Sequence, residues 1–227
     1  MNRTDSPGLR VSGLRYRIKG RTLLDNVELS VSPGESVAVT GPSGSGKSTL
    51  LMCVLGLIEP QAGTITAGGR EITGLRPTQL ARVRRKTLGM VFQFGELLPE
   101  LSPVENVALP ILLDGGRHQD AYRRAKELLD ELGVPAGSTL TGMLSGGERQ
   151  RTAVARALIT EPDVLLADEP TGSLDPDAKE GVARLLFTTA RERGSALLLV
   201  THDLTVAARA DRRHELLGGI LAEAGAL

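Results

Sequence analysis

One glycine-rich segment constrains the fold of this chain more than any other feature. Gly41–Thr49 reads GPSGSGKST and fits the pattern G-x-x-x-x-G-K-[ST]; it follows the apolar run Ser36–Thr40 and precedes a predicted helix from Lys47 to about Leu57. In that context the pattern predicts a loop whose backbone N–H groups cradle phosphates. Lys47 is then expected to reach the β- and γ-phosphates, and the Ser48 hydroxyl to bind Mg²⁺. The alternative is a glycine-rich turn that binds nothing, which the strand and helix on either side disfavour.

A second anion-binding helix start is predicted in the segment Leu144–Gln150, which reads LSGGERQ. Ser145 followed three residues later by Glu148 forms a capping box, which predicts the start of a helix. Gly146 and Gly147 leave the N–H groups of the first turn approachable, and such a helix start attracts anions. Two anion-binding sites in one small chain are explained if the loop of one chain and the helix start of another bind the same nucleotide.

Polar side chains follow three other predicted strands. Asp168 and Glu169 follow an apolar run, 163–167, and ligands of parallel α/β sheets bind at such strand ends. Asp168 is a candidate to hold Mg²⁺, directly or through water, and Glu169 to orient and deprotonate the attacking water. His202 is a candidate to contact the γ-phosphate or the catalytic glutamate, and Gln93 to bind Mg²⁺ or water through its amide oxygen. The alternatives are an acidic loop for the carboxylates and structural roles for His202 and Gln93.

Composition excludes several classes of protein. The formal net charge is 0, so no overall field attracts nucleic acid or anionic lipid. Two tyrosines and three phenylalanines, with no tryptophan, disfavour a base-stacking platform. The lone Cys53 excludes an internal disulfide framework, and the longest apolar run, Leu50–Ile58, is far shorter than a membrane span. The other two histidines, His118 and His214, do not follow a predicted strand as His202 does, and they are interpreted as surface residues.

Alternating strands and helices predict an α/β fold with a mostly parallel sheet covered by helices on both faces. The expected strands are 27–31, 36–40, 88–92, 163–167 and 196–200, with a hairpin of 64–66 and 70–72. A helix is expected over 176–193. The middle of the chain is expected to be helical, because Ser102 and Ser145 mark helix starts and Gly133 with Pro135 marks a helix end.

Together these residues resemble the nucleotide-binding subunit of ATP-binding cassette (ABC) transporters, over nearly the whole chain and in the right order. Gly41–Thr49 resembles the Walker A loop, Val164–Glu169 the Walker B strand with its catalytic glutamate, and Leu144–Gln150 the ABC signature. Gln93 is similar in place to the Q-loop glutamine and His202 to the switch histidine. Ser173–Asp175 resembles the D-loop, and Tyr16 is placed like the aromatic residue that stacks on adenine.

The resemblance implies a single domain, 1–227, with a P-loop NTPase core (about 1–93 and 161–227), an N-terminal antiparallel β region and an ABC-specific helical subdomain (about 94–160). It also implies a dimer that binds two ATP with Mg²⁺. The residues then expected to bind ATP within one chain are Tyr16, Gly41, Pro42, Ser43, Gly44, Ser45, Gly46, Lys47, Ser48 and Thr49. Those expected to bind it in trans are Ser145, Gly146, Gly147 and Asp175. Glu169, His202, Lys47 and Gln93 are expected to catalyse hydrolysis, and Ser48, Gln93 and Asp168 to bind the metal.

The implied partners are a second nucleotide-binding subunit, with a homodimer favoured, and a separately encoded integral-membrane permease, but no nucleic acid. This places the chain at the cytoplasmic face of the cell membrane. A groove near 93–105, with Phe94, Leu97 and Leu98, is the expected permease surface, although these side chains can also pack the helical segment. The alternative is a cassette that acts without transport, such as a regulator of a membrane-bound cell-wall or signalling partner.

A finer resemblance concerns the segments Val91–Leu101 and Ala167–Asp175, which are similar to the lipoprotein-release, macrolide-export and peptide-resistance branch. It implies export, extraction or mechanical work on a lipoprotein, peptide or drug. The segment His214–Leu221 departs from the family, because His214 and Glu215 weaken the first of two expected strands.

Overall fold

The central element of the fold is a six-stranded sheet. The computed structural model describes residues 7–135 and 140–224. The strand order is β10-β9-β3-β8-β7-β6, in which β9, β3, β8, β7 and β6 are parallel and β10 pairs antiparallel with β9. The strands are β3 (Ser36–Thr40), β6 (Leu88–Val91), β7 (Val164–Asp168), β8 (Ala196–Val200), β9 (Arg212–Leu217) and β10 (Ile220–Glu223). The predicted α/β fold with a mostly parallel sheet is confirmed.

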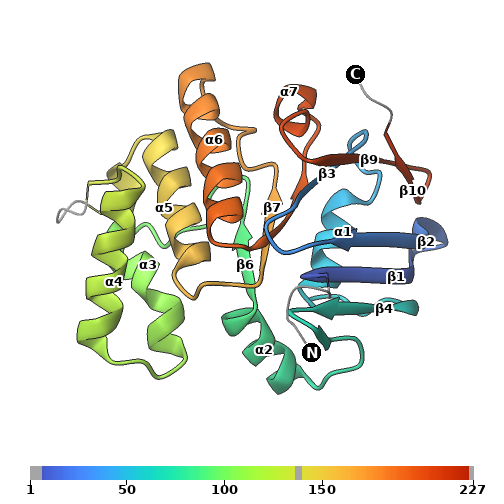
Figure 1. The fold of residues 1–227 in the computed structure, drawn as a ribbon, viewed down its shortest axis with the longest axis horizontal. Helices are drawn as coiled ribbons and strands as arrows, with labels where there is room; N and C mark the ends of the chain where they lie inside the picture. The colour runs from blue at the N-terminus through green and yellow to red at the C-terminus, as the bar shows by residue number, and fades with distance from the viewer. Residues whose placement is uncertain (1–6, 136–139, 225–227) are drawn as a thin grey trace.

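A second, antiparallel sheet has the order β2-β1-β4-β5 and lies at the opposite end of the molecule from α3 and α4 (Figure 1). Its strands are β1 (Leu9–Ile18), β2 (Arg21–Val31), β4 (Ala62–Ala67) and β5 (Arg70–Glu71). The predicted hairpin is β4–β5, and its turn residues Gly68 and Gly69 have φ angles of 56° and 74°, which glycine adopts without strain.

Seven α-helices join or cover the strands of the described residues. They are α1 (Lys47–Val54), α2 (Pro77–Lys86), α3 (Pro103–Leu113), α4 (His118–Glu131), α5 (Gly146–Leu158), α6 (Pro176–Glu192) and α7 (Leu204–Ala207). The capping boxes at Ser102 and Ser145 start α3 and α5 as predicted. These two helices and α4 pack together at one end of the molecule (Figure 1). The boundaries of a helical subdomain at about 94 and 160 stay a prediction.

Two hydrophobic clusters lie on opposite faces of the central sheet. In β7, Leu165 belongs to the cluster with α3–α6, whereas Leu166 belongs to the cluster with α1 and the antiparallel sheet. Leu197 and Leu198 of β8 alternate in the same way. Because both faces are buried, these strands are apolar throughout rather than alternating with polar residues. Within 7–135 and 140–224, no helix is both long enough and apolar enough to cross a membrane.

The interpretation of His214 as a surface residue was wrong. Its exposed fraction is 9%, because β9 pairs with β3 at Val39↔His214 and turns alternate side chains inward. Its Nδ1 has no hydrogen-bond partner among the described residues. Burial, followed by the positive charge of Arg212, lowers the pKa of His214. His118 is exposed as predicted and stacks on Tyr122 at 4.4 Å between ring centroids. The predicted weakness of the first C-terminal strand was also wrong, since β9 and β10 both form.

Candidate nucleotide-binding and hydrolysis site

A cavity of about 760 Å³ opens where β3, β6, β7 and β8 end. It brings together all six residues that the sequence analysis predicted for catalysis or metal binding, and Ser43, Gly44, Gly46 and Thr49 of the phosphate loop line it as well. The six are Lys47, Ser48, Gln93, Asp168, Glu169 and His202. They come from different strand ends because parallel strands present their carboxyl ends at one edge of the sheet.

Glycines of the phosphate loop lie against backbone that leaves no room for a side chain. A Cβ on Gly41 would lie 2.5 Å from the carbonyl oxygen of Leu216, and one on Gly46 would lie 2.5 Å from that of Leu23. Both glycines also have positive φ angles, 145° and 110°. The loop therefore needs glycine at these two positions to lie where it does, at the start of α1.

Two polar groups of the loop suit a phosphate. Lys47 is only 7% exposed, and its Nζ donates to the carbonyl oxygens of Gly41 at 2.7 Å and Pro42 at 3.0 Å. The Ser45 hydroxyl is buried and has no partner among the described residues. A buried donor without a partner costs free energy, and an anion in the loop would satisfy it. The residues present thus fit the phosphates of ATP.

Ser48 and Asp168 form a pair of oxygen donors suited to Mg²⁺. The Ser48 hydroxyl donates to Asp168 Oδ1 at 3.3 Å. Burial raises the pKa of Asp168, the nearby charge of Glu169 raises it further, and the contact with Ser48 and the charge of Lys47 oppose this rise. A desolvated carboxylate next to a second one is stabilised by a cation, and hard oxygen ligands favour Mg²⁺.

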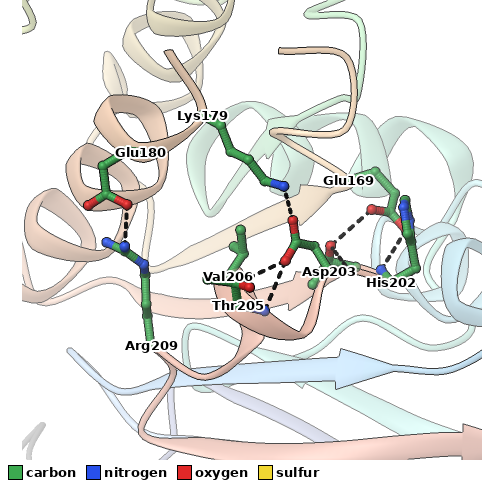
Figure 2. A network of polar contacts seen from close by, with 9 residues as sticks. Glu169, Lys179, Glu180, His202, Asp203, Thr205, Val206 and Arg209 are labelled. Carbon is green, nitrogen blue, oxygen red and sulfur yellow. Dashed lines mark hydrogen bonds and ion pairs between the residues drawn. The ribbon is translucent and has the colours of Figure 1, made fainter. Parts of the chain in front are cut away.

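The carboxylate of Glu169 is held by the segment that follows β8 (Figure 2). Its Oε1 accepts the backbone N–H of His202 at 2.9 Å and contacts His202 Nδ1 at 2.8 Å, and its Oε2 accepts the Thr201 hydroxyl at 2.9 Å. Glu169 has a φ of 45°, and its N–H donates to the carbonyl of Val200 at 2.9 Å. A non-glycine residue in this conformation is uncommon and often lies at a functional site.

Gln93 is placed between β6 and the segment after Glu169. The Ser173 hydroxyl donates to its carbonyl oxygen at 3.3 Å, and a Cβ on Gly172 would lie 3.1 Å from its Nε2. The amide of Gln150 in α5 donates to the neighbouring carbonyl of Phe92 at 2.9 Å. Gln93 therefore touches both the cavity and the loop that leads to α6.

The signature residues lie outside this cavity. Ser145 and Gly146 are exposed, and of the described residues that line the cavity none belongs to the segment 144–148. The Ser145 hydroxyl donates to Glu148 Oε2 at 2.7 Å and accepts the N–H of Glu148 at 3.3 Å. The first turn of α5 lies next to the start of α6, since a Cβ on Gly147 would lie 3.2 Å from the Cβ of Ala178. Asp175 caps α6 by accepting the N–H of Ala178 at 3.0 Å.

The structure places Tyr16 differently from the other predicted binding residues. Tyr16 is partly buried and packs against the cluster under the antiparallel sheet, and it is not among the described residues that line the cavity. Ile18, Arg21 and Leu23 line it instead, and Arg21 Nη2 donates to the carbonyl of Gly44 at 2.9 Å. Sequence analysis missed these residues, because only the end of β2 shows the alternation of a half-buried strand and no strand was predicted over the segment of β1, which ends at Ile18.

The fold and this site define the class of the protein, a P-loop nucleotide hydrolase. The sequence matches the ABC transporter family over residues 24–172. The chain belongs to the ABC transporter family and is one of its ATPases.

Relatives and solved structures agree with this assignment. The lipoprotein-releasing system ATP-binding protein LolD of Bordetella pertussis is 46% identical over 201 residues, covering 88% of this chain and 87% of that protein. LolD of Chromohalobacter salexigens is 45% identical over 203 residues, covering 89% and 86%. The dimeric ATP-binding cassette MJ0796, bound to ADP and Pi, superposes with a TM-score of 0.84 at 32% identity and covers 96% of this chain and 100% of its own. For cbiO1 of Clostridium perfringens the TM-score is 0.86 at 27% identity, covering 96% and 88%.

Proposed function

We propose that this chain is the ATP-hydrolysing motor subunit of an ABC transporter and that two copies enclose two ATP molecules. One observation carries the proposal: the phosphate loop borders a cavity, whereas the signature helix start of the same chain is exposed and outside it. A helix N-terminus that is open to solvent is free to meet the ATP held by another chain. The dimeric cassette with a TM-score of 0.84 supports this arrangement.

The residues then have distinct roles. Lys47 and the loop N–H groups bind the β- and γ-phosphates, Ser48 and Asp168 bind Mg²⁺ together with Gln93, and Glu169 accepts the proton of the attacking water. Mg²⁺ supplies positive charge that offsets the charge developing on the phosphates. His202 contacts Glu169 Oε1 at 2.8 Å and orients the carboxylate. The second chain contributes Ser145, Gly146, Gly147 and Asp175. Tyr16 remains a proposed adenine contact.

The loop after β6 is the proposed docking surface for a membrane permease. Phe94 and Leu98 are 67% and 46% exposed, whereas Leu97 is partly buried against the helical core. The buried side chain of Asn106 fixes this loop, because its Oδ1 accepts the N–H of Leu98 at 2.8 Å and its Nδ2 donates to the carbonyl of Leu98 at 2.9 Å. Two exposed apolar side chains on a fixed loop suit a protein partner.

Hydrogen bonds connect the same loop to α5, the helix that starts in the signature segment Leu144–Gln150. Arg156 of α5 donates to the carbonyls of Glu96 at 2.7 Å and Gly95 at 2.8 Å. A displacement of the docking loop would therefore reach α5, whose first turn faces the ATP of the other chain. We propose that this path couples hydrolysis to a permease in the membrane, with the chain at its cytoplasmic face.

For the substrate, we propose a lipoprotein that the permease extracts or releases. The names of the LolD relatives at 45–46% identity support it. A peptide or drug substrate, or a non-transport role in regulating a cell-wall or signalling partner, is the competing function. Homodimerisation is proposed over a heterodimer because one chain carries both halves of the composite site.

The test is a reconstituted complex of this chain with its co-encoded permease in lipid vesicles. We expect a lipid-modified protein to stimulate ATP hydrolysis and to be released, and the same protein without its lipid to do neither. Phe94→Ser with Leu98→Ser should abolish permease binding, whereas Leu113→Ser, with the same 67% exposure as Phe94 but at the far end of α3, should not. Equal stimulation by the protein without lipid would exclude a lipoprotein substrate.

A further inference from the structure

A chain of polar contacts joins the start of α6 to the carboxylate of Glu169 (Figure 2). Asp175 caps α6, and the backbone N–H of Lys179 donates to the carbonyl of Asp175 at 2.9 Å. The ammonium of Lys179 forms an ion pair with Asp203, in the segment after β8. Residues four apart lie on the same face of a helix, so a movement of Asp175 would be shared by Lys179.

Asp203 is fixed by more than this ion pair. Its Oδ1 accepts the N–H groups of Thr205 at 2.9 Å and Val206 at 3.3 Å, which caps α7. The hydrogen bond from Lys179 has the largest effect and lowers the pKa of Asp203; burial opposes it, and the two backbone N–H groups lower the pKa further. The carboxylate therefore stays ionised and keeps its hold on Lys179 at neutral pH.

From Asp203 the contacts lead to the proposed general base through Thr201. The N–H of Asp203 donates to the Thr201 hydroxyl oxygen at 3.0 Å, and that hydroxyl donates to Glu169 Oε2 at 2.9 Å. Thr201 is 1% exposed, so no solvent competes for its proton. Because its oxygen already accepts from a backbone N–H, the orientation in which its proton points at Glu169 is favoured. His202 holds the other carboxylate oxygen.

We infer that Lys179 is a positioning residue for ATP hydrolysis, which through Asp203 and Thr201 sets where the carboxylate of Glu169 lies. The first turn of α6, which carries Asp175, is thereby connected to the general base of the same chain. A second chain that displaces Asp175 when it docks would shift the base at the same moment. This inference rests on the proposed roles of Glu169 and Asp175.

A neighbouring ion pair offers a matched control. Glu180 of α6 pairs with Arg209, just after α7, so it ties α6 to the same segment of the chain (Figure 2). Within 7–135 and 140–224, neither Glu180 nor Arg209 contacts Asp203, Thr201 or Glu169 directly; the backbone N–H of Arg209 donates to the carbonyl of Val206 at 3.1 Å. The two pairs thus share their helix, but only the Lys179 pair holds the side chain of Asp203, and it is the more buried of the two.

The experiment compares Lys179→Met with Glu180→Gln in the full-length protein, by steady-state ATP hydrolysis. For Lys179→Met we expect kcat to fall roughly 2- to 30-fold, the range for substitutions that alter coupling without touching the ligand, with little change in KM. Glu180→Gln should keep the kcat of the wild type. The midpoint of thermal unfolding should change little in Glu180→Gln, which loses an exposed ion pair, and only modestly in Lys179→Met, because Asp203 keeps the N–H groups of Thr205 and Val206.

Two further variants separate positioning from a general structural role. Lys179→Arg keeps the charge and should restore most of kcat. Asp203→Asn keeps an oxygen that caps α7, so Lys179→Met combined with it should be no slower than the slower single variant. Equal loss of kcat in Lys179→Met and Glu180→Gln, or multiplicative losses in the double variant, would overturn the inference. Failure of the proposed function would instead appear as normal hydrolysis in Glu169→Gln.

Discussion

The two proposed phosphate-binding features of this chain, the loop Gly41–Thr49 and the start of α5, differ in which hydrogen bonds their polar groups make. In the loop, Lys47 is 7% exposed and the Ser45 hydroxyl is buried without a partner among the described residues. At the start of α5, Ser145 is exposed and exchanges hydrogen bonds with Glu148 at 2.7 and 3.3 Å. The loop thus contains a buried hydroxyl without a hydrogen-bond partner among the described residues. At the helix start, the serine hydroxyl has its hydrogen bonds and is accessible to solvent.

This contrast implies a division of labour between two copies. In the proposed dimer, one chain encloses the nucleotide from the side of the phosphate loop and Glu169, and the other closes the site with the helix start of α5. A capping box that is complete before binding needs little rearrangement, because the helix N–H groups and dipole already point outward.

The largest expected effect is on the chemistry beside the phosphate loop. Glu169→Gln should keep ATP binding but reduce kcat by about 10²–10⁴-fold, the usual contribution of general acid–base catalysis. It should also trap a closed dimer in Mg-ATP, since hydrolysis is what opens it. Steady-state hydrolysis and chromatographic sizing measure both effects. Hydrolysis at the rate of the wild type would remove Glu169 from the role of base.

Lys47→Ala tests binding by the loop itself. The variant loses a charge-assisted contact worth roughly 1.5–3 kcal/mol, so ATP affinity should fall about 10- to 150-fold. Calorimetry on the isolated chain measures the affinity for ATP. Arg21→Ala, at the edge of the cavity, should lower this affinity less than Lys47→Ala does. Unchanged affinity in Lys47→Ala would contradict the assignment of the loop.

The two capping boxes allow a sharper comparison of the α5 start with an ordinary helix start. Ser102 and Ser145 make matching contacts, 2.7 Å to a glutamate oxygen and 3.3 Å from its N–H. Ser102→Ala and Ser145→Ala should each lower the free energy of unfolding by about 1 kcal/mol. Only Ser145→Ala should also slow hydrolysis. Equal ATPase rates in both variants would reduce the signature to a structural cap.

The smallest expected effect is on the stability of the fold and concerns His214, which has no proposed part in nucleotide binding. Its pKa is lowered from 6.5, so the folded protein holds the neutral ring and the unfolded chain takes up the proton first. The free energy of unfolding should therefore fall as the pH drops from 6.5 through the lowered pKa. His214→Leu should show a weaker pH dependence in denaturant titrations at pH 7 and pH 5.5. If the free energy of unfolding changed with pH as much in His214→Leu as in the wild type, His214 would be excluded as a source of acid sensitivity.

Sequence patterns predicted the features whose residues are adjacent in the chain. The strand, loop and helix around Lys47 and the capping boxes at Ser102 and Ser145 are local, so their structural signal is complete in a few residues. The contacts of Thr201 and Arg21 were not predicted, because they depend on which strands become neighbours. His214 was misjudged for the same reason, since its burial comes from pairing with β3 rather than from its own segment.

The central claim is that the start of α5 completes the ATP site of a second chain. Light scattering in Mg-ATP tests it by comparing Glu169→Gln with the double variant Ser145→Arg/Glu169→Gln, after calorimetry has shown that both bind ATP. We expect a dimer for Glu169→Gln and a monomer for the double variant, because the arginine side chain would occupy the place of the γ-phosphate held by the facing chain. A dimer of undiminished stability in the double variant would contradict the composite site.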